Sequence, residues 1–202
     1  GIYHGAIGAQ DAINPVARTN VCPENHGPKE VSMLAYTYSI PSSVAVKSFV
    51  LSGGGDAKKG SEPYRDRIIA YGDTSLHGLR QKMVHVITEM QTRLAGLALS
   101  WHDVTKVQAY SVQPIASLVD ELLSKPGLIP DGLIWHFARP PVRGLEYEMD
   151  LRGMVNELFI FLLLYIPPTY IFNGQFLFSS LIFFSQFFQA SRFSFLFCGK
   201  QL

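Results

Sequence analysis

The chain has 202 residues, with 17 Lys and Arg against 16 Asp and Glu and a formal net charge of +1. This length is enough for one domain with a hydrophobic core and an appendage. The balanced charge gives no basic footprint for nucleic acid, so we expect no nucleic-acid partner. The two cysteines, Cys22 and Cys198, have no metal-ligand spacing, so we expect no disulfide framework, no metal site and no cofactor, in a reducing, cytoplasmic compartment.

The first part of the chain is read as a leader followed by strands. Residues 1–29 contain Pro, Gly and Asn with few periodic apolar residues, and we interpret them as a leader or partial N-terminal segment. Residues 45–51 favour a strand because they are apolar and β-branched. The glycine run 53–55 is typical of a flexible turn that ends this strand, residues 58–66 of a loop, and residues 67–71 of a short second strand.

The clearest predicted element is a long helix that begins after Asp73-Thr74-Ser75, which offers N-cap side chains. Its apolar residues recur at steps of three and four and form one stripe, with Gly96 as a C-cap. The polar residues, Lys82 among them, are expected on the other faces. The stripe consists of Leu79, Met83, Val86, Met90 and Leu94.

Four further elements follow. Residues 104–112 favour a strand, and Pro114 begins a second helix that Lys125-Pro126-Gly127 ends. Residues 133–137 favour another strand, and residues 145–151 alternate apolar and acidic side chains, which is typical of a strand with one buried face. The apolar stripe of the second helix consists of Ile115, Leu118, Val119 and Leu122.

This order of elements predicts an α+β fold. The simplest arrangement is a single mixed β-sheet with both helices packed on one face. The other face then needs cover, and a domain spanning residues 30–152 has no further element to supply it. We therefore expect copies of the chain to associate through that face.

The composition changes near residue 153. Of the 14 Phe, 12 follow residue 150, and residues 158–191 contain no charged side chain. Three interpretations of the Phe-rich segment 153–202 stay open. The first is a membrane segment or hairpin through residues 158–191, for which about 20 apolar residues are needed. The second is a buried extension of the core. The third is a non-native extension, translated from thymine-rich noncoding sequence after a retained intron or frameshift.

Three stretches resemble the Rid family of reactive-intermediate deaminases (YjgF, L-PSP endoribonuclease-like) over residues 36–152. Tyr38-Ser39 precedes a strand that ends in Ser52-Gly53. A long helix leads through an Ala-Gly-Leu turn, residues 95–97, into Asp103-Val104 and a strand. The final strand, residues 145–148, reads Leu-Glu-Tyr-Glu, similar to the family's Val-Glu-Ile-Glu. The resemblance implies a chorismate-mutase-like fold and a homotrimer with small-molecule ligands in the clefts between subunits.

The resemblance also implies an activity, the hydrolytic deamination of enamine or imine intermediates of 2-keto acids. Glu146 aligns with the glutamate that places the attacking water, and Arg139 is the candidate for the arginine that binds the substrate carboxylate. The family position of that arginine holds Asp131, which would repel a carboxylate. Tyr38, Ser52 and Asp131 are expected to line the cleft.

Three hypotheses for the function follow. The first is a Rid-type deaminase that uses Glu146 and Arg139. The second is a non-catalytic trimer that binds a small ligand and lacks the usual carboxylate-binding arginine, as Asp131 suggests. The third is a Rid-like protein tethered to a membrane through residues 158–191. Ribonuclease activity has no support, because no basic and aromatic residues are interleaved.

Overall fold

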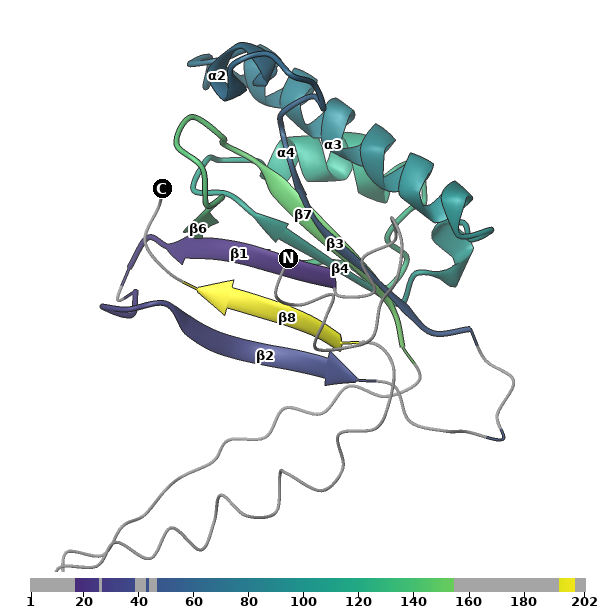
Figure 1. Ribbon diagram of the computed structural model, residues 1–202. Helices are drawn as coiled ribbons and strands as arrows, with labels where there is room; N and C mark the ends of the chain where they lie inside the picture. The colour runs from purple at the N-terminus through teal and green to yellow at the C-terminus, as the bar shows by residue number, and fades with distance from the viewer. Residues whose placement is uncertain (1–16, 26, 39–42, 44–46, 155–192, 199–202) are drawn as a thin grey trace, which may run out of the picture.

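The computed structural model describes residues 17–25, 27–38, 43, 47–154 and 193–198. Its central sheet has the strand order β3 (Phe49–Gly55), β7 (Glu148–Gly153), β4 (Lys106–Tyr110) and β5 (Ile134–His136). The sheet is mixed, because β4 and β5 are parallel while β7 is antiparallel to both β3 and β4. Helices α3 (Leu76–Gly96) and α4 (Ala116–Val119) lie on one side of it (Figure 1). The predicted α+β fold with two helices on one face is confirmed.

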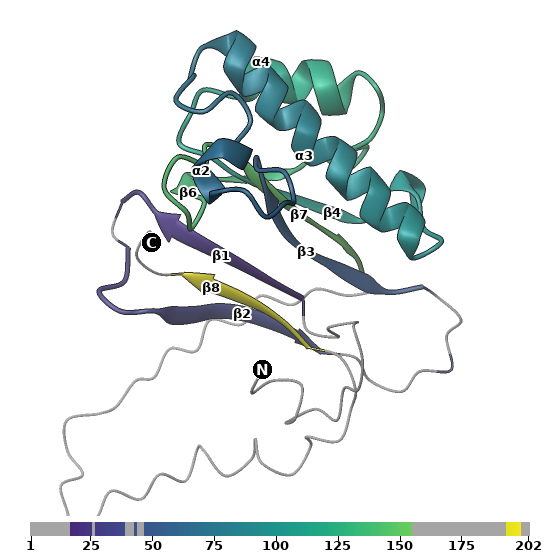
Figure 2. The same ribbon diagram turned by 45° about the horizontal axis from the view of Figure 1, so that its top comes forward.

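The prediction of a single sheet was wrong. A second sheet has the order β2 (Ser32–Tyr38), β8 (Phe193–Cys198), β1 (Ala17–Pro23) and β6 (Ala138–Arg139). Figure 2 shows β1 between β8 and β3, on the side of the central sheet away from the helices. We expected a loop at residues 17–23, because these residues show little apolar alternation. They form a strand because β1 is stabilised by pairing with the distant strands β6 and β8.

The Phe-rich segment contributes β8, which pairs in parallel with β1 and antiparallel with β2. The proposed membrane segment, residues 158–191, lies outside the described residues. Within the described ranges, no helix is both long and apolar enough to cross a bilayer.

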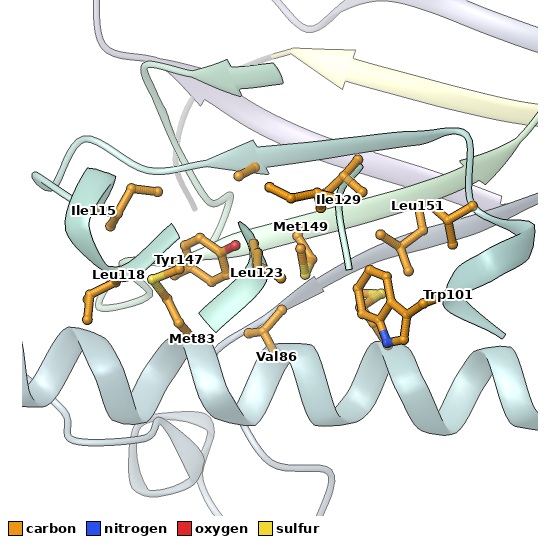
Figure 3. Close-up of a cluster of buried hydrophobic side chains, with 14 of the residues drawn as sticks. Met83, Val86, Trp101, Ile115, Leu118, Leu123, Ile129, Tyr147, Met149 and Leu151 are labelled. Carbon is orange, nitrogen blue, oxygen red and sulfur yellow. The ribbon is translucent and has the colours of Figure 1, made fainter. Parts of the chain in front are cut away.

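The core lies between α3, α4 and the central sheet. All five residues of the predicted α3 stripe are buried, with at most 1% of their surface exposed. Figure 3 shows Met83 and Val86 facing Tyr147 and Met149 across this core. The helix begins as predicted, because the Ser75 side chain accepts a hydrogen bond from the Gly78 amide, and it ends at Gly96.

Lys82 departs from the prediction, because it is fully buried on the sheet side of α3. Its Nζ donates to Asp56 Oδ2 at 2.9 Å and to the Ile69 carbonyl at 2.6 Å. The other Asp56 oxygen accepts from the amides of Glu146 and Tyr147. This buried ion pair therefore joins α3 to the segment that leads into β7.

Three local predictions also differ from the structure. The glycine run belongs to strand β3 and is not a turn after it. Residues 67–71 form no strand; α2 (Tyr64–Arg67) is followed by a single bridge between Ala57 and Ile68. After α4 the chain continues as a π-helical turn, Asp120–Ser124. That turn is wider than an α-turn, and Leu123 takes the fully buried position while Leu122 is only half-buried.

Candidate active site

The side of β7 that faces away from the helices is polar and buried. Successive residues of a strand point to opposite faces, so Tyr147, Met149 and Leu151 enter the core while Glu148 and Asp150 point the other way. Strand β1 lies against this second face. Thr19 bonds to Asp150 there, and Val21 packs with Tyr110 and Ala138. Polar side chains are thus enclosed between the two sheets.

A pocket of about 190 Å³ opens beside Glu148. It lies between β1, β3, α2 and the segment that precedes β7. The register of β3 against β7 shifts between Leu51 and Gly54, an irregularity often found next to active sites. The residues that line the pocket are Arg18, Asn20, Gly53, Gly55, Tyr64, Pro141, Val142, Leu145 and Glu148.

Gly53 leaves room for the Glu148 carboxyl group. A Cβ atom at position 53 would overlap Glu148 Oε1 and would lie 2.9 Å from Thr19 Cγ2. A larger residue here would displace side chains of β1 and β7 that approach the β3 backbone closely. The glycine run, which suggested a turn, instead makes space for the carboxyl group at the pocket wall.

Glu148 has the ionisation behaviour of a catalytic acid. Only 5% of its surface is exposed, and burial, followed by the negative charge of Asp150, raises its pKa to about 8. The guanidinium of Arg93 acts in the opposite direction. Glu148 is therefore largely protonated at neutral pH and can release its proton with little cost, which general acid–base catalysis requires.

Asp150 is held by three donors from two strands, Thr19 on β1 and Gln108 and Tyr110 on β4. Its Oδ2 accepts from the Thr19 hydroxyl at 2.8 Å and from the Tyr110 hydroxyl at 2.7 Å. Its Oδ1 accepts from Gln108 Nε2 at 3.1 Å. Burial, and next the charge of Asp150, raise the pKa of Tyr110 above its ordinary value, so this hydroxyl keeps its proton and donates.

Comparison with known proteins identifies the family. Residues 4–158 match the family of the 2-aminomuconate deaminase CnbZ. The chain belongs to the CnbZ family. It is also 54% identical over 150 residues to a 2-amino-5-chloromuconate deaminase of Comamonas testosteroni, an alignment that covers 73% of this chain and 60% of that protein. These are Rid/YjgF-family deaminases, so the resemblance found in the sequence is confirmed. No solved structure matches the chain.

The two residues expected to be catalytic have other partners in this CnbZ-family protein. Glu146 is half-buried just before β7 and accepts from Gln113 Nε2 at 2.8 Å. Arg139 on β6 donates two hydrogen bonds, of 2.6 and 2.8 Å, to the carboxylate of Glu24 next to β1. Neither side chain lines the pocket beside Glu148.

The residues expected to bind substrate are also spread over the CnbZ-family chain. Ser52 lies at the contact of β1 and β3, where its hydroxyl accepts from the Arg18 amide at 3.3 Å. Asp131 is exposed in the turn before β5. Tyr38 is the last residue of β2, and its side chain lies outside what the structure describes. Ser52 and Asp131 are absent from the lining of the pocket.

The pocket residues were not recognisable in the sequence for two reasons. Arg18 and Asn20 belong to a strand that was read as a leader. Glu148 and Glu146 both occupy polar positions of the alternating stretch 145–151, and the alternation cannot tell which of them is buried. The available signal was the acidic pair Glu148 and Asp150, two residues apart on one face of a predicted strand.

Proposed function

We propose that this protein hydrolyses the enamine of a 2-aminomuconate-type substrate to a 2-keto acid and ammonia, with Glu148 as the acid and base. The observation that carries the proposal is a buried carboxyl group in a pocket wall, with a pKa of about 8. Membership of the CnbZ family and the named activity of the relative support the choice of substrate.

The reaction needs one group that first gives and then takes a proton. 2-Aminomuconate is a six-carbon diene with a carboxylate at each end and an amino group next to one of them. Protonated Glu148 gives its proton to the carbon beside the C–N carbon, which converts the enamine to an iminium ion. The resulting carboxylate takes a proton from the water that adds to the C–N carbon. Glu148 passes that proton to the amino nitrogen, the C–N bond breaks and ammonia leaves with the electron pair of that bond. The hydroxyl group forms the keto C=O bond and returns its proton to Glu148, which is then ready for the next turnover.

Arg18 is the candidate for holding a substrate carboxylate. It lines the pocket from β1, and its guanidinium can pair with a carboxylate through two parallel hydrogen bonds. In this proposal, Arg18 binds the substrate carboxylate, which Asp131 at the family position of the arginine would repel. Tyr64, Val142 and Leu145 offer flat and apolar surface for the diene.

The YjgF-like version of the α+β fold, the homotrimer and the clefts between subunits belong to the same proposal, and family membership supports them. An uncovered apolar face gives the trimer no support, because the far face of the central sheet carries buried polar groups and β1 lies against it. Light scattering coupled to gel filtration measures the number of subunits, and a monomeric mass contradicts the trimer.

Replacing Glu148 tests the proposed activity. We expect Glu148→Gln to lower kcat by about 10²-fold or more, the usual contribution of general acid–base catalysis. Activity is followed by the loss of diene absorbance and by ammonia release from 2-aminomuconate. Glu121→Gln is the control, because Glu121 is exposed at the surface, where it pairs with Arg80.

Glu146→Gln decides between the two glutamates. If this variant loses activity while Glu148→Gln retains it, the role of Glu148 is contradicted. A wild-type protein that binds 2-aminomuconate without releasing ammonia would contradict the enzymatic function and favour a ligand-binding trimer.

A further inference from the structure

The mechanism above does not use Asp150 and the hydrogen bonds around it. We infer that Asp150 is a positioning residue, which lies on the same buried face of β7 as Glu148, is tied through Thr19 to the wall beside it, and sets the pH range of the deaminase. The inference rests on the proposed function of Glu148. It concerns how a second carboxyl group, which lies outside the lining of the pocket, prepares the first one for the reaction.

The position of Asp150 brings its charge close to Glu148. The two residues are two apart on the same face of β7, so their Cα atoms are separated by roughly 7 Å. Exposed surface is 5% for Glu148 and 1% for Asp150. Charges at this separation interact far more strongly in a buried setting than in water, and a second negative charge there is unfavourable.

The hydrogen bonds hold the Asp150 carboxylate without cancelling its charge. Its donors are two hydroxyl groups and an amide, all neutral. All three donate, so the Asp150 side chain is the acceptor in each of these hydrogen bonds. Asp150 also forms an ion pair with Arg152, whose Nε lies 3.7 Å from Asp150 Oδ1.

Thr19 links Asp150 to the wall against which Glu148 lies. The Thr19 hydroxyl donates to Asp150 Oδ2 and accepts from the Gly53 amide at 3.1 Å. Gly53 is the residue whose Cα faces the Glu148 carboxyl group. The same contacts that orient Asp150 therefore also fix the β3 backbone beside Glu148.

Other charged or titratable groups face Glu148 from the surrounding elements. Asp56 also opposes ionisation of Glu148, but its charge is paired with buried Lys82 at 2.9 Å. Arg93 favours ionisation, and its Nη1 is held by the carbonyl of Ser52 at 3.0 Å. Among the described residues, these groups are Asp150 on β7, Tyr110 on β4, Asp56 after β3, Arg93 on α3, Tyr64 on α2 and Arg18 on β1.

Asp150→Asn tests the inference, because asparagine keeps the size of the side chain and removes its charge. We expect the titration midpoint of Glu148, followed by ¹³C NMR of its carboxyl carbon, to move to lower pH. The alkaline limb of the kcat/KM profile, where protonated Glu148 is lost, should move in the same direction. Asp120→Asn is the control, because Asp120 pairs with Lys125 at the exposed surface of the π-helical turn after α4. We expect no shift of the Glu148 midpoint in this variant.

Arg152→Gln is the second variant and serves if Asp150→Asn does not fold. It removes the cation beside Asp150, and the Glu148 midpoint should then move to higher pH. An unchanged midpoint in a folded Asp150→Asn variant, or an unchanged or lowered midpoint in Arg152→Gln, overturns the inference. A midpoint that moves in NMR while the activity profile stays fixed shows that Asp150 acts on Glu148 but contradicts the catalytic role of Glu148, and with it the control of the pH range. An unmoved midpoint contradicts the inference about Asp150 alone, so the two failures are distinguishable.

Discussion

The two sides of β7 are equally buried and chemically opposite. On the helix side Tyr147, Met149 and Leu151 are fully buried among α3, α4 and Trp101. On the other side Glu148 and Asp150 are almost as inaccessible. Apolar burial stabilises the fold, whereas burial of a carboxyl group costs free energy unless it is paired or protonated. The site proposed for the reaction therefore lies on the side of β7 where burial is unfavourable.

The two sides also differ in how they are built. The helix side joins elements that show their own periodicity in the sequence. The other side is closed by β1, which pairs with β6 and bonds to β7, both more than 100 residues away. Three variants break or sharpen this contrast.

The largest effect is expected on the helix side, where Lys82 is the buried polar exception. Lys82→Met leaves Asp56 buried without its cation, and we expect the free energy of unfolding to fall by about 3–5 kcal/mol. Urea denaturation measures this loss. Lys125→Met removes an exposed pair with Asp120 and should change little. Equal stability of the Lys82 and Lys125 variants would show that the buried pair is unimportant.

The second effect concerns pH and stability on the polar side. The folded pKa of Glu148 is about 8 and lies above its ordinary value of 4.5, so the folded chain keeps a proton that the unfolded chain releases. Between these two values the stability of the wild type therefore decreases as pH rises. Glu148→Gln removes this dependence, and we expect it to be more stable than the wild type by ~3 kcal/mol at pH 7.

Denaturation curves at several pH values measure this difference. The two proteins should be equally stable near pH 4, where Glu148 is protonated in both the folded and the unfolded chain. A Glu148→Gln variant that is less stable than the wild type at pH 7 would contradict the raised pKa.

The smallest of the three effects is expected from Gly53→Ala. The added methyl group would displace the Glu148 carboxyl group, and a displacement of this size can lower kcat/KM by about 10- to 100-fold. Gly96→Ala is the matched control, because a Cβ atom there meets no heavy atom within 4 Å. Steady-state kinetics of both variants with 2-aminomuconate measure the difference. Similar kinetics for the two would show that Gly53 does not shape the site.

The helix side could be predicted because its signals are local. The patterns that predict the α3 stripe, the Ser75 cap and the strands β4 and β5 each involve residues within a few positions of one another. The site could not be predicted, because Glu146 and Glu148 are two residues apart and fall on the same face of the alternating stretch 145–151. Which of the two is buried depends on contacts with a residue outside that stretch. Asp56 holds the Glu146 and Tyr147 amides from the end of β3, and β7 begins only at Glu148.

The sequence by itself determined the α+β class, the amphipathic α3 and the relation to the Rid deaminases, since periodicity, caps and ordered motifs are written in consecutive residues. Only the tertiary structure decided that the glycine run lies within β3, that Lys82 is buried, and that Arg18 and Glu148 line one pocket. The physical reason is that the burial of a charge, and with it the pKa of a carboxyl group, depends on which distant strand lies against it.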